Sequence, residues 1–211
     1  VEWRFHQYKR MLRGAELALV EGNKGLYDGL ALDGSNSNAA LARRLGLPVL
    51  LVIDARGMTR GIAPLILGYQ AFDRDIRIAG VILNKLGGSR HEAKLRAVIE
   101  HYTDVPVLGA VLDNPALAIV ERHLGLMPAN ETAAEAHNAT IAAIAKTVSE
   151  QVDIERLLQA TATDQPLRPA VQPAAQAAQP AIRLGIARDP AFGFYYADDL
   201  DALKQAGAEP V

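Results

Sequence analysis

Short apolar runs alternate with segments of helical composition along most of the chain. Residues 48–53, 78–83 and 105–111 are apolar without a polar residue at every second position, which is typical of strands buried on both faces of a parallel sheet. Residues 59–72 and 89–102 predict helices between them, and the second opens with Ser-Arg-His-Glu, the pattern of a capping box. The alternation predicts an α/β fold, a parallel sheet with flanking helices and right-handed crossovers.

The first part of the chain predicts a helix, a strand and a glycine-rich loop. Residues 3–13 have mostly long side chains and predict a helix, and the apolar residues 16–21 predict a short strand. Residues 22–34 hold several glycines and predict a loop with special backbone needs. The side chains of residues 35–38 suit the start of a helix over 39–45, which ends at a glycine.

The last third of the chain changes character twice. The alanine-rich residues 131–160 predict one long helix, and residues 161–181 hold four prolines and no aromatic residue, which predicts a stiff linker. Residues 182–187 then predict a strand and 198–206 a helix. We therefore expect one domain over 1–160, the linker over 161–181, and the start of a second domain over 182–211.

Composition places the chain among globular proteins. Half of the residues are hydrophobic and 22% are charged. The net charge of −2 gives no electrostatic reason to expect nucleic acid or an anionic membrane as partner, and no apolar run reaches the roughly 18 residues that span a bilayer. Cysteine is absent, which excludes disulfides and thiolate metal sites. We expect a cytoplasmic enzyme and, because the chain starts at Val1 without Met, an internal piece of a longer protein.

Two carboxylates lie on the predicted glycine-rich loop, one at its start and one within it. Glu21 ends an apolar run and precedes Gly22, an arrangement by which α/β proteins present a carboxylate to Mg²⁺ at the carboxyl edge of the sheet. Asp28 lies in a Gly-Leu-Tyr-Asp-Gly segment, whose glycines let the backbone approach a ligand closely. The two acids could share Mg²⁺ and a phosphorylated substrate. A strand-end acid and a turn acid without a ligand explain the pattern equally well.

Polar residues also follow the next two apolar runs. Asp54 and Arg56 come after residues 48–53, where they could contact substrate or phosphate or form an ordinary solvated turn. Asn84 follows residues 78–83, and its amide can both donate to and accept from a purine edge. Taken alone, the Asn84 motif fits a strand-end turn better than a nucleotide site.

Glu121, Arg122 and His123 follow the last predicted strand after a loop. His123 could act as a base or line an adenine pocket, but a lone histidine is more often structural, so we assign it no proton transfer. The other histidines lack metal-ligand spacing and are expected at helix surfaces. No Gly-x-x-x-x-Gly-Lys-Ser/Thr loop occurs in the sequence. Either the protein lacks such a loop or the loop precedes Val1. We expect the second.

Several ordered motifs resemble those of the cobyrinic acid a,c-diamide synthase family. They cover nearly the whole chain except the linker, and ERHLGL is a highly specific marker of the family. The motifs are EGNKGLYDG at 21–29, PVLLVIDARGMTR at 48–60, AGVILNKL at 79–86, VPVLG at 105–109, ERHLGL at 121–126 and IRLGIARDPAFGFYY at 182–196.

The resemblance implies a P-loop-type domain similar to dethiobiotin synthetase, followed by a class I glutaminase domain. In that family the glutaminase releases ammonia from glutamine. The first domain uses ATP and Mg²⁺ to phosphorylate a peripheral carboxylate of a tetrapyrrole, and ammonia converts the acyl phosphate to an amide. Homodimerisation is left open. Because the P-loop and the glutaminase cysteine are absent from the sequence, we do not expect this chain to be active by itself.

Carried over by position, the resemblance assigns roles to eleven residues. Glu21 would bind Mg²⁺, and Asp28 would bind and orient the acyl phosphate. The nucleotide would be contacted by Asn84, Lys85, Glu121, Arg122 and His123, with Asn84 at adenine, and the substrate by Tyr27, Ser35, Asp54 and Arg56.

Two segments depart from the family pattern beside the expected substrate site. The chain reads NKG where VMG is expected and GSNSNAALA where GSTADLA is expected. The substrate could therefore be cobyrinic or hydrogenobyrinic acid, or a sirohaem or nickel-sirohydrochlorin macrocycle. A partitioning-type P-loop ATPase is the alternative from another class, and the glutaminase-like residues 182–196 argue against it.

Overall fold

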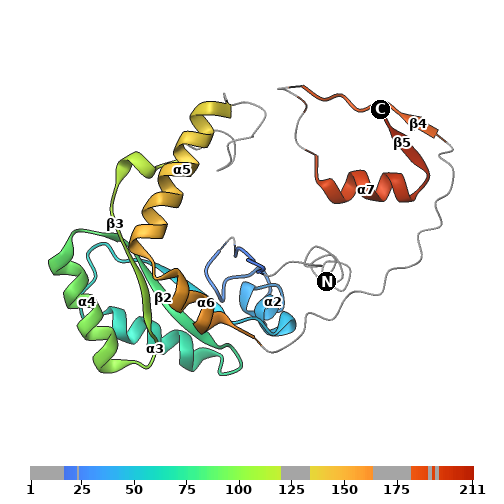
Figure 1. The fold of residues 1–211 in the computed structure, drawn as a ribbon. Helices are drawn as coiled ribbons and strands as arrows, with labels where there is room; N and C mark the ends of the chain where they lie inside the picture. The colour runs from blue at the N-terminus through green and yellow to red at the C-terminus, as the bar shows by residue number, and fades with distance from the viewer. Residues whose placement is uncertain (1–16, 23, 120–133, 164–181, 190–191, 193–194) are drawn as a thin grey trace. The chain divides into compact units, whose positions relative to one another are not determined.

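The computed structural model describes residues 17–22, 24–119, 134–163, 182–189, 192 and 195–211 (Figure 1). The chain divides into two compact units, residues 1–116 with 144–170 and residues 117–143 with 171–211. The predicted helix over 3–13 and the predicted site residues Glu121, Arg122 and His123 lie outside the described residues. Within the described part, no helix is long and apolar enough to cross a membrane.

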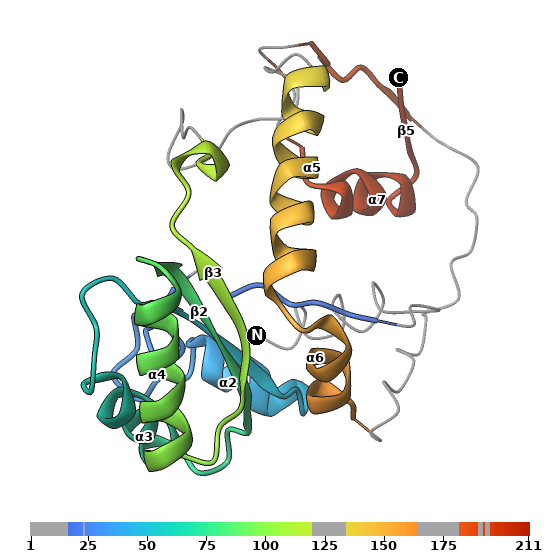
Figure 2. The same cartoon turned by 60° about the vertical axis from the view of Figure 1, so that its left-hand side comes forward.

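The first unit contains a three-stranded parallel sheet, which confirms the predicted α/β fold. Its order is β1 (Val49–Asp54), β2 (Ile78–Leu86) and β3 (Val107–Leu112), and β3 leads into the 3₁₀ turn η1 (Pro115–Leu117). The helices α3 (Ile62–Phe72) and α4 (Ser89–Tyr102) form the crossovers and lie side by side (Figures 1 and 2). Right-handed crossovers between consecutive parallel strands place both helices on one face of the sheet.

The hydrophobic core lies between the sheet and these two helices. Its centre consists of fully buried side chains: Ile62 and Ile66 of α3, Val81 and Leu83 of β2, and Leu95 and Ile99 of α4. Burial of each such side chain contributes about 1.5–3 kcal/mol.

The expectation that β1 is buried on both faces is wrong. Val52 is 61% exposed, whereas its neighbours Leu51 and Ile53 are buried. The physical reason is that α6 (Ile154–Thr161), which packs on the sheet, does so mainly on β2 and β3.

Capping residues set both ends of α2 (Asn38–Leu45), as the sequence predicts. The hydroxyl of Ser37 accepts a hydrogen bond from the Ala40 N–H at 3.1 Å, which satisfies a donor of the first turn. Gly46 ends the helix with a φ of 67°, a left-handed conformation that glycine adopts without strain.

The predicted strand over 16–21 is wrong in its described part. Residues 17–22 have no strand pairing, and Leu17 and Leu19 are 64% and 89% exposed. An apolar run becomes a strand only when a neighbouring backbone takes up its hydrogen bonds, and no described strand lies beside this segment.

The predicted long helix is interrupted. The structure has α5 (Ala134–Gln151) and α6, separated by Val152 and Asp153. Asp153 donates its N–H to the Leu108 carbonyl of β3 at 2.8 Å, and its carboxylate caps α6 by accepting from the Arg156 N–H. Tertiary contact with the sheet therefore overrides the helical propensity of the sequence.

The predicted capping box at the start of α4 is also wrong. Gly88 is the N-cap residue, and Ser89 already belongs to the helix. The Glu92 carboxylate pairs instead with Arg96 one turn along, at 2.8 Å.

The second unit contains a β-α-β arrangement. Strand β4 (Ile182–Leu184), helix α7 (Ala197–Gln205) and strand β5 (Ala208–Pro210) follow one another, and the two strands pair in parallel. The strand and helix predicted here are present, with β4 shorter than expected and β5 additional.

Candidate functional site

The glycine-rich loop over residues 24–29 is fastened to both α2 and α3. The Asp28 N–H donates to the Gly25 carbonyl at 3.1 Å and closes a turn. The Ala39 N–H of α2 donates to the Leu26 carbonyl at 2.8 Å. Because these bonds tie the loop to a helix, Asp28 occupies a defined position.

Tyr27 anchors this loop to α3. Its hydroxyl donates to the Tyr69 carbonyl at 2.7 Å, and its ring packs 5.6 Å from the ring of Tyr69 and 4.7 Å from that of Phe72. Burial and, second, the negative charge of Asp73 raise the pKa of Tyr27, so the hydroxyl keeps its proton. The hydroxyl therefore fastens the loop to α3, and the substrate contact expected for Tyr27 stays a prediction.

The glycines of this loop leave room for polar side chains. A Cβ on Gly25 would collide with the Asp28 carboxylate, which folds back over the turn. Asp28 is exposed to solvent. The loop therefore holds a carboxylate at the surface with its backbone fixed, an arrangement suited to binding a cation or a cation-bound phosphate.

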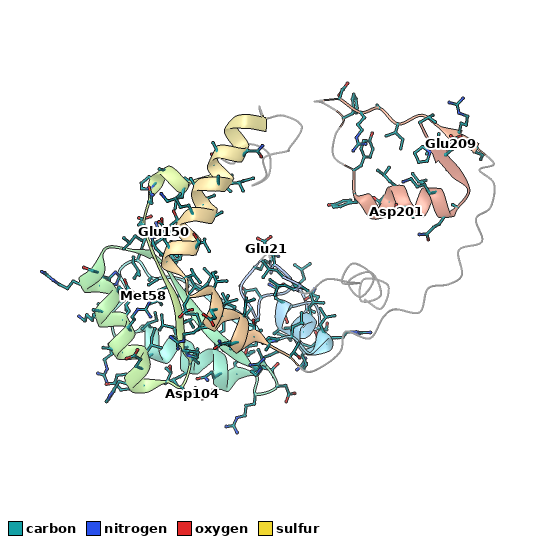
Figure 3. All side chains as sticks on the ribbon, viewed as in Figure 1. Glu21, Met58, Asp104, Glu150, Asp201 and Glu209 are labelled. Carbon is teal, nitrogen blue, oxygen red and sulfur yellow. The ribbon has the colours of Figure 1, made fainter. Side chains whose placement is uncertain are left out.

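Glu21 and Ser35 lie exposed on either side of the loop, and Figure 3 labels Glu21. The Ser35 N–H donates to the Asp33 carboxylate at 3.0 Å, and this hydrogen bond lowers the pKa of Asp33. Sequence reasoning did not single out Asp33, because an aspartate before Gly-Ser looks like an ordinary turn residue.

The carboxylates present could bind Mg²⁺ only together with water or phosphate oxygens, because too few of them lie close together to enclose the ion. Among the described residues, no group of three or more acidic, histidine or cysteine side chains could hold a metal ion. Mg²⁺ usually takes one or two protein carboxylates together with water and phosphate oxygens. The exposed Glu21 fits that requirement as a single ligand.

A charged cluster occupies the carboxyl edge of the sheet. Asp54 of β1 pairs with Asn84 of β2 in the strand register. Its carboxylate accepts from Arg56 through Nη2 at 2.6 Å and Nε at 3.0 Å, and the Lys85 Nζ lies 3.6 Å away. The Arg56 hydrogen bonds hold the pKa of Asp54 well below its usual range, so this carboxylate stays ionised.

Lys85 carries backbone strain at the same edge. Its φ is 59°, and the pairing of β2 with β3 shifts register between Leu83 and Leu86. The left-handed conformation is uncommon for a residue with a Cβ. The Asn84 amide oxygen accepts from the Lys85 N–H at 2.9 Å, so one acceptor position of the residue predicted to contact adenine is used within the strand.

His91 joins two loops at this edge. Its Nδ1 accepts from the Gly87 N–H at 3.3 Å, so Nε2 carries the proton and donates to the Met58 carbonyl at 2.8 Å. The ring is half-buried, which corrects the expectation of a surface histidine. It borders an open depression of about 500 Å³ lined by Gly87, Gly88, Ser89, Arg90, His91 and Lys94.

The predicted site residues thus fall into two described groups. The loop group comprises Glu21, Tyr27, Asp28 and Ser35, and the edge group comprises Asp54, Arg56, Asn84 and Lys85. No hydrogen bond or ion pair among the described residues links the two groups. Figure 3 shows Glu21 apart from Met58, which follows the Asp54–Arg56 turn.

The parallel sheet, its crossover helices and the polar residues at the strand ends are the features of an α/β domain, and comparison of the sequence with known families identifies which one. The chain belongs to the AAA domain family, whose model matches residues 2–120, more than half of its length.

Within that class the chain is similar to cobyrinate a,c-diamide synthases, which confirms the resemblance read from the motifs. The enzyme of Magnetococcus marinus is 42% identical over 205 residues, which cover 94% of this chain and 44% of the relative. That of Methanosarcina acetivorans is 44% identical over 207 residues, 94% of this chain and 42% of the relative. The chain therefore spans less than half the length of these relatives. No solved structure matches it.

Proposed function

We propose that this chain is part of a cytoplasmic enzyme that amidates the a and c carboxylates of cobyrinic or hydrogenobyrinic acid in cobalamin biosynthesis, using ATP and glutamine. One observation carries the proposal. Relatives named cobyrinate a,c-diamide synthase align with 94% of this chain at 42% and 44% identity. Similarity across both units favours the same reaction over a nucleotide-dependent switch.

The chemistry requires activation of a carboxylate, because its leaving group would be oxide. Bound MgATP supplies a phosphoryl group, which gives the substrate a leaving group, while the metal offsets repulsion between the anions. Ammonia then attacks the acyl carbon, phosphate leaves, and an amide bond replaces the acyl–phosphate bond. Of this chain's residues, Glu21 would hold the metal and Asp28 would orient the activated carboxyl group.

The edge group would act on anionic oxygens. Arg56 and Lys85 are partly exposed cations that share the Asp54 carboxylate. Asp54 holds both cations in place, and its negative charge offsets part of their positive charge before a ligand binds. Asn84 would then contact the nucleotide base through the part of its amide that the Lys85 N–H does not use.

We further propose that residues 182–211 begin a class I glutaminase domain, which would supply the ammonia. The parallel β4-α7-β5 unit is compatible with the opening of an α/β glutaminase domain. The motif IRLGIARDPAFGFYY, which runs from β4 to the start of α7, supports the same assignment.

The test is amidation by the full-length gene product that contains this chain. The protein is incubated with MgATP, glutamine and, separately, cobyrinic acid, hydrogenobyrinic acid, sirohaem and nickel-sirohydrochlorin, and mass spectrometry counts carboxyl-to-amide exchanges. Exchange at two sites of cobyrinic or hydrogenobyrinic acid is expected. Exchange on the sirohaem-type macrocycles alone would replace the substrate assignment, and ATP hydrolysis without exchange on any macrocycle would refute the proposal.

A further inference from the structure

Two asparagines, Asn36 just before α2 and Asn38 at its first position, bond to the backbone of residues 24–31. The Asn36 Oδ1 accepts a hydrogen bond from the Ala31 N–H at 3.1 Å. The Asn38 Nδ2 donates to the carbonyls of Lys24 at 3.0 Å and Gly25 at 3.4 Å. The two carboxamides therefore hold the loop backbone on both sides of the Tyr27 anchor.

Each asparagine occupies space that a glycine leaves open. A Cβ on Gly22 would lie 2.8 Å from the Asn38 Nδ2, and a Cβ on Gly29 would collide with the Asn36 Oδ1. Gly22 directly follows Glu21, and Gly29 directly follows Asp28. The asparagine side chains thus pack against the two glycines that follow the carboxylates proposed to act on metal and substrate.

The asparagines project from a rigid base. Between them lies Ser37, which is 7% exposed and caps α2 by accepting from the Ala40 N–H. Ala39, which directly follows Asn38, is 2% exposed. Since buried helix residues have little freedom, Asn36 and Asn38 transmit the fixed position of α2 to the loop.

We infer that Asn36 and Asn38 are positioning residues that set the places of Asp28 and Glu21 for amidation. This inference rests on the proposed function. Neither asparagine touches a reacting atom; each acts through a glycine next to a carboxylate. A displacement of about 1 Å at reacting groups can cost about a hundredfold in rate. Loss of the hydrogen bonds of either asparagine should therefore lower the rate of amidation strongly and the free energy of unfolding only slightly.

The experiment is a double-mutant cycle in the full-length gene product, with Gly22→Ala, Asn38→Ala and both together. Removing the Asn38 carboxamide and displacing it with a methyl group on residue 22 break the same contact. We expect each single change to lower kcat/KM for the macrocycle by about tenfold or more, and the double variant to be no worse than either. The rate of glutamine hydrolysis should not change. Gly29→Ala and Asn36→Ala form the second cycle, and Asn138→Ala, an exposed asparagine of α5, is the matched control.

Additive losses within a cycle, or amidation by Asn38→Ala equal to that of Asn138→Ala, would overturn the inference. Hydrogen exchange in the full-length gene product, without substrates, tests these hydrogen bonds independently of the reaction. The Asp28 amide, bonded to the Gly25 carbonyl, should exchange faster in Asn38→Ala and at the original rate in Asn138→Ala. Unchanged exchange would reject the inference, whereas faster exchange in an enzyme that amidates no macrocycle would reject only the proposed function.

Discussion

Lys85 is held in a conformation that costs free energy, and its surroundings explain why the chain tolerates it. The pairing of β2 with β3 shifts register between Leu83 and Leu86, and the Lys85 N–H donates to the Asn84 amide oxygen at this irregularity of the strand. The result is an ammonium group within 3.6 Å of Asp54 at the sheet edge. Strain of this kind costs on the order of 1–3 kcal/mol and is concentrated at functional sites.

Lys85→Gly should therefore stabilise the protein and impair the reaction. Glycine adopts a φ of 59° freely, so the free energy of unfolding in urea should rise by about 1 kcal/mol, because the exposed ion pair that is lost contributes little. Lys94→Gly, within α4, is the control and should lower it by about 1 kcal/mol. A destabilised Lys85→Gly variant would show that the backbone carries no strain there.

The pKa of Asp54 should depend on the presence of the Arg56 side chain, which is the main cause of its depression. The depressed pKa means that Asp54 contributes stability above the ordinary carboxyl value of 3.8, and that this contribution is lost as the pH falls below that value. Arg56→Ala should move the pKa of Asp54 up toward 3.8 in an NMR titration of the side-chain carboxyl. Arg60→Ala, on the same loop, should leave it in place. No upward movement in Arg56→Ala would assign the depression to another group.

At the scale of elements, two strand glycines leave room for neighbouring side chains, one within the sheet and one between the sheet and the break that separates α5 from α6. A Cβ on Gly80 of β2 would overlap the Leu108 side chain, and one on Gly109 of β3 would lie 2.7 Å from the Val152 Cγ2. The second contact places Val152 in the break between α5 and α6. The glycine therefore leaves room for Val152 against β3.

Gly109→Ala should destabilise the protein by about 1–3 kcal/mol, because the added methyl group has no room between β3 and Val152. Gly68→Ala is the matched control, since no atom lies within 4 Å of a Cβ there and the residue is within α3. It should stabilise the protein by about 0.5–1 kcal/mol. Equal effects in thermal unfolding would contradict this account of the strand glycine.

The sequence predicted those elements whose signal is local and failed where distant contacts decide. Apolar runs located β1, β2 and β3, and Ser37 and Gly46 marked the ends of α2. The break at Val152 depends on bonding to β3, which no local pattern records. Residues 17–21 have the composition of a strand but no described partner.

The candidate site follows the same rule. Acidic and amide residues at strand ends were recognisable because their position after an apolar run is local. The roles of Asn36 and Asn38 were missed, since asparagines before a helix look like caps. The fastening of Tyr27 to Tyr69 joins residues 42 positions apart, so only the folded chain reveals it.

At the scale of the whole molecule, the proposed reaction needs two chemistries that the chain keeps in separate segments. Glu21 and Asp28, the candidate residues for metal binding and for orienting the activated carboxyl group, belong to the first unit, and residues 182–211, with the β4-α7-β5 arrangement, belong to the second. Glutamine hydrolysis would take place in the domain that begins there. Loss of a carboxylate in the glycine-rich loop should therefore separate the two activities.

Asp28→Asn in the full-length gene product should abolish amidation while glutamine hydrolysis continues. Asparagine keeps the size of the side chain and the backbone bond to Gly25, but it removes the charge that would orient the activated carboxyl group. Ammonia release and amide formation are measured in the same reaction, with Asp75→Asn, an exposed acid after α3, as control. Normal diamide formation by Asp28→Asn would mean that the loop is only a structural connection. Loss of both activities would instead mean that the charge at Asp28 also affects the glutaminase, so that the two chemistries are coupled.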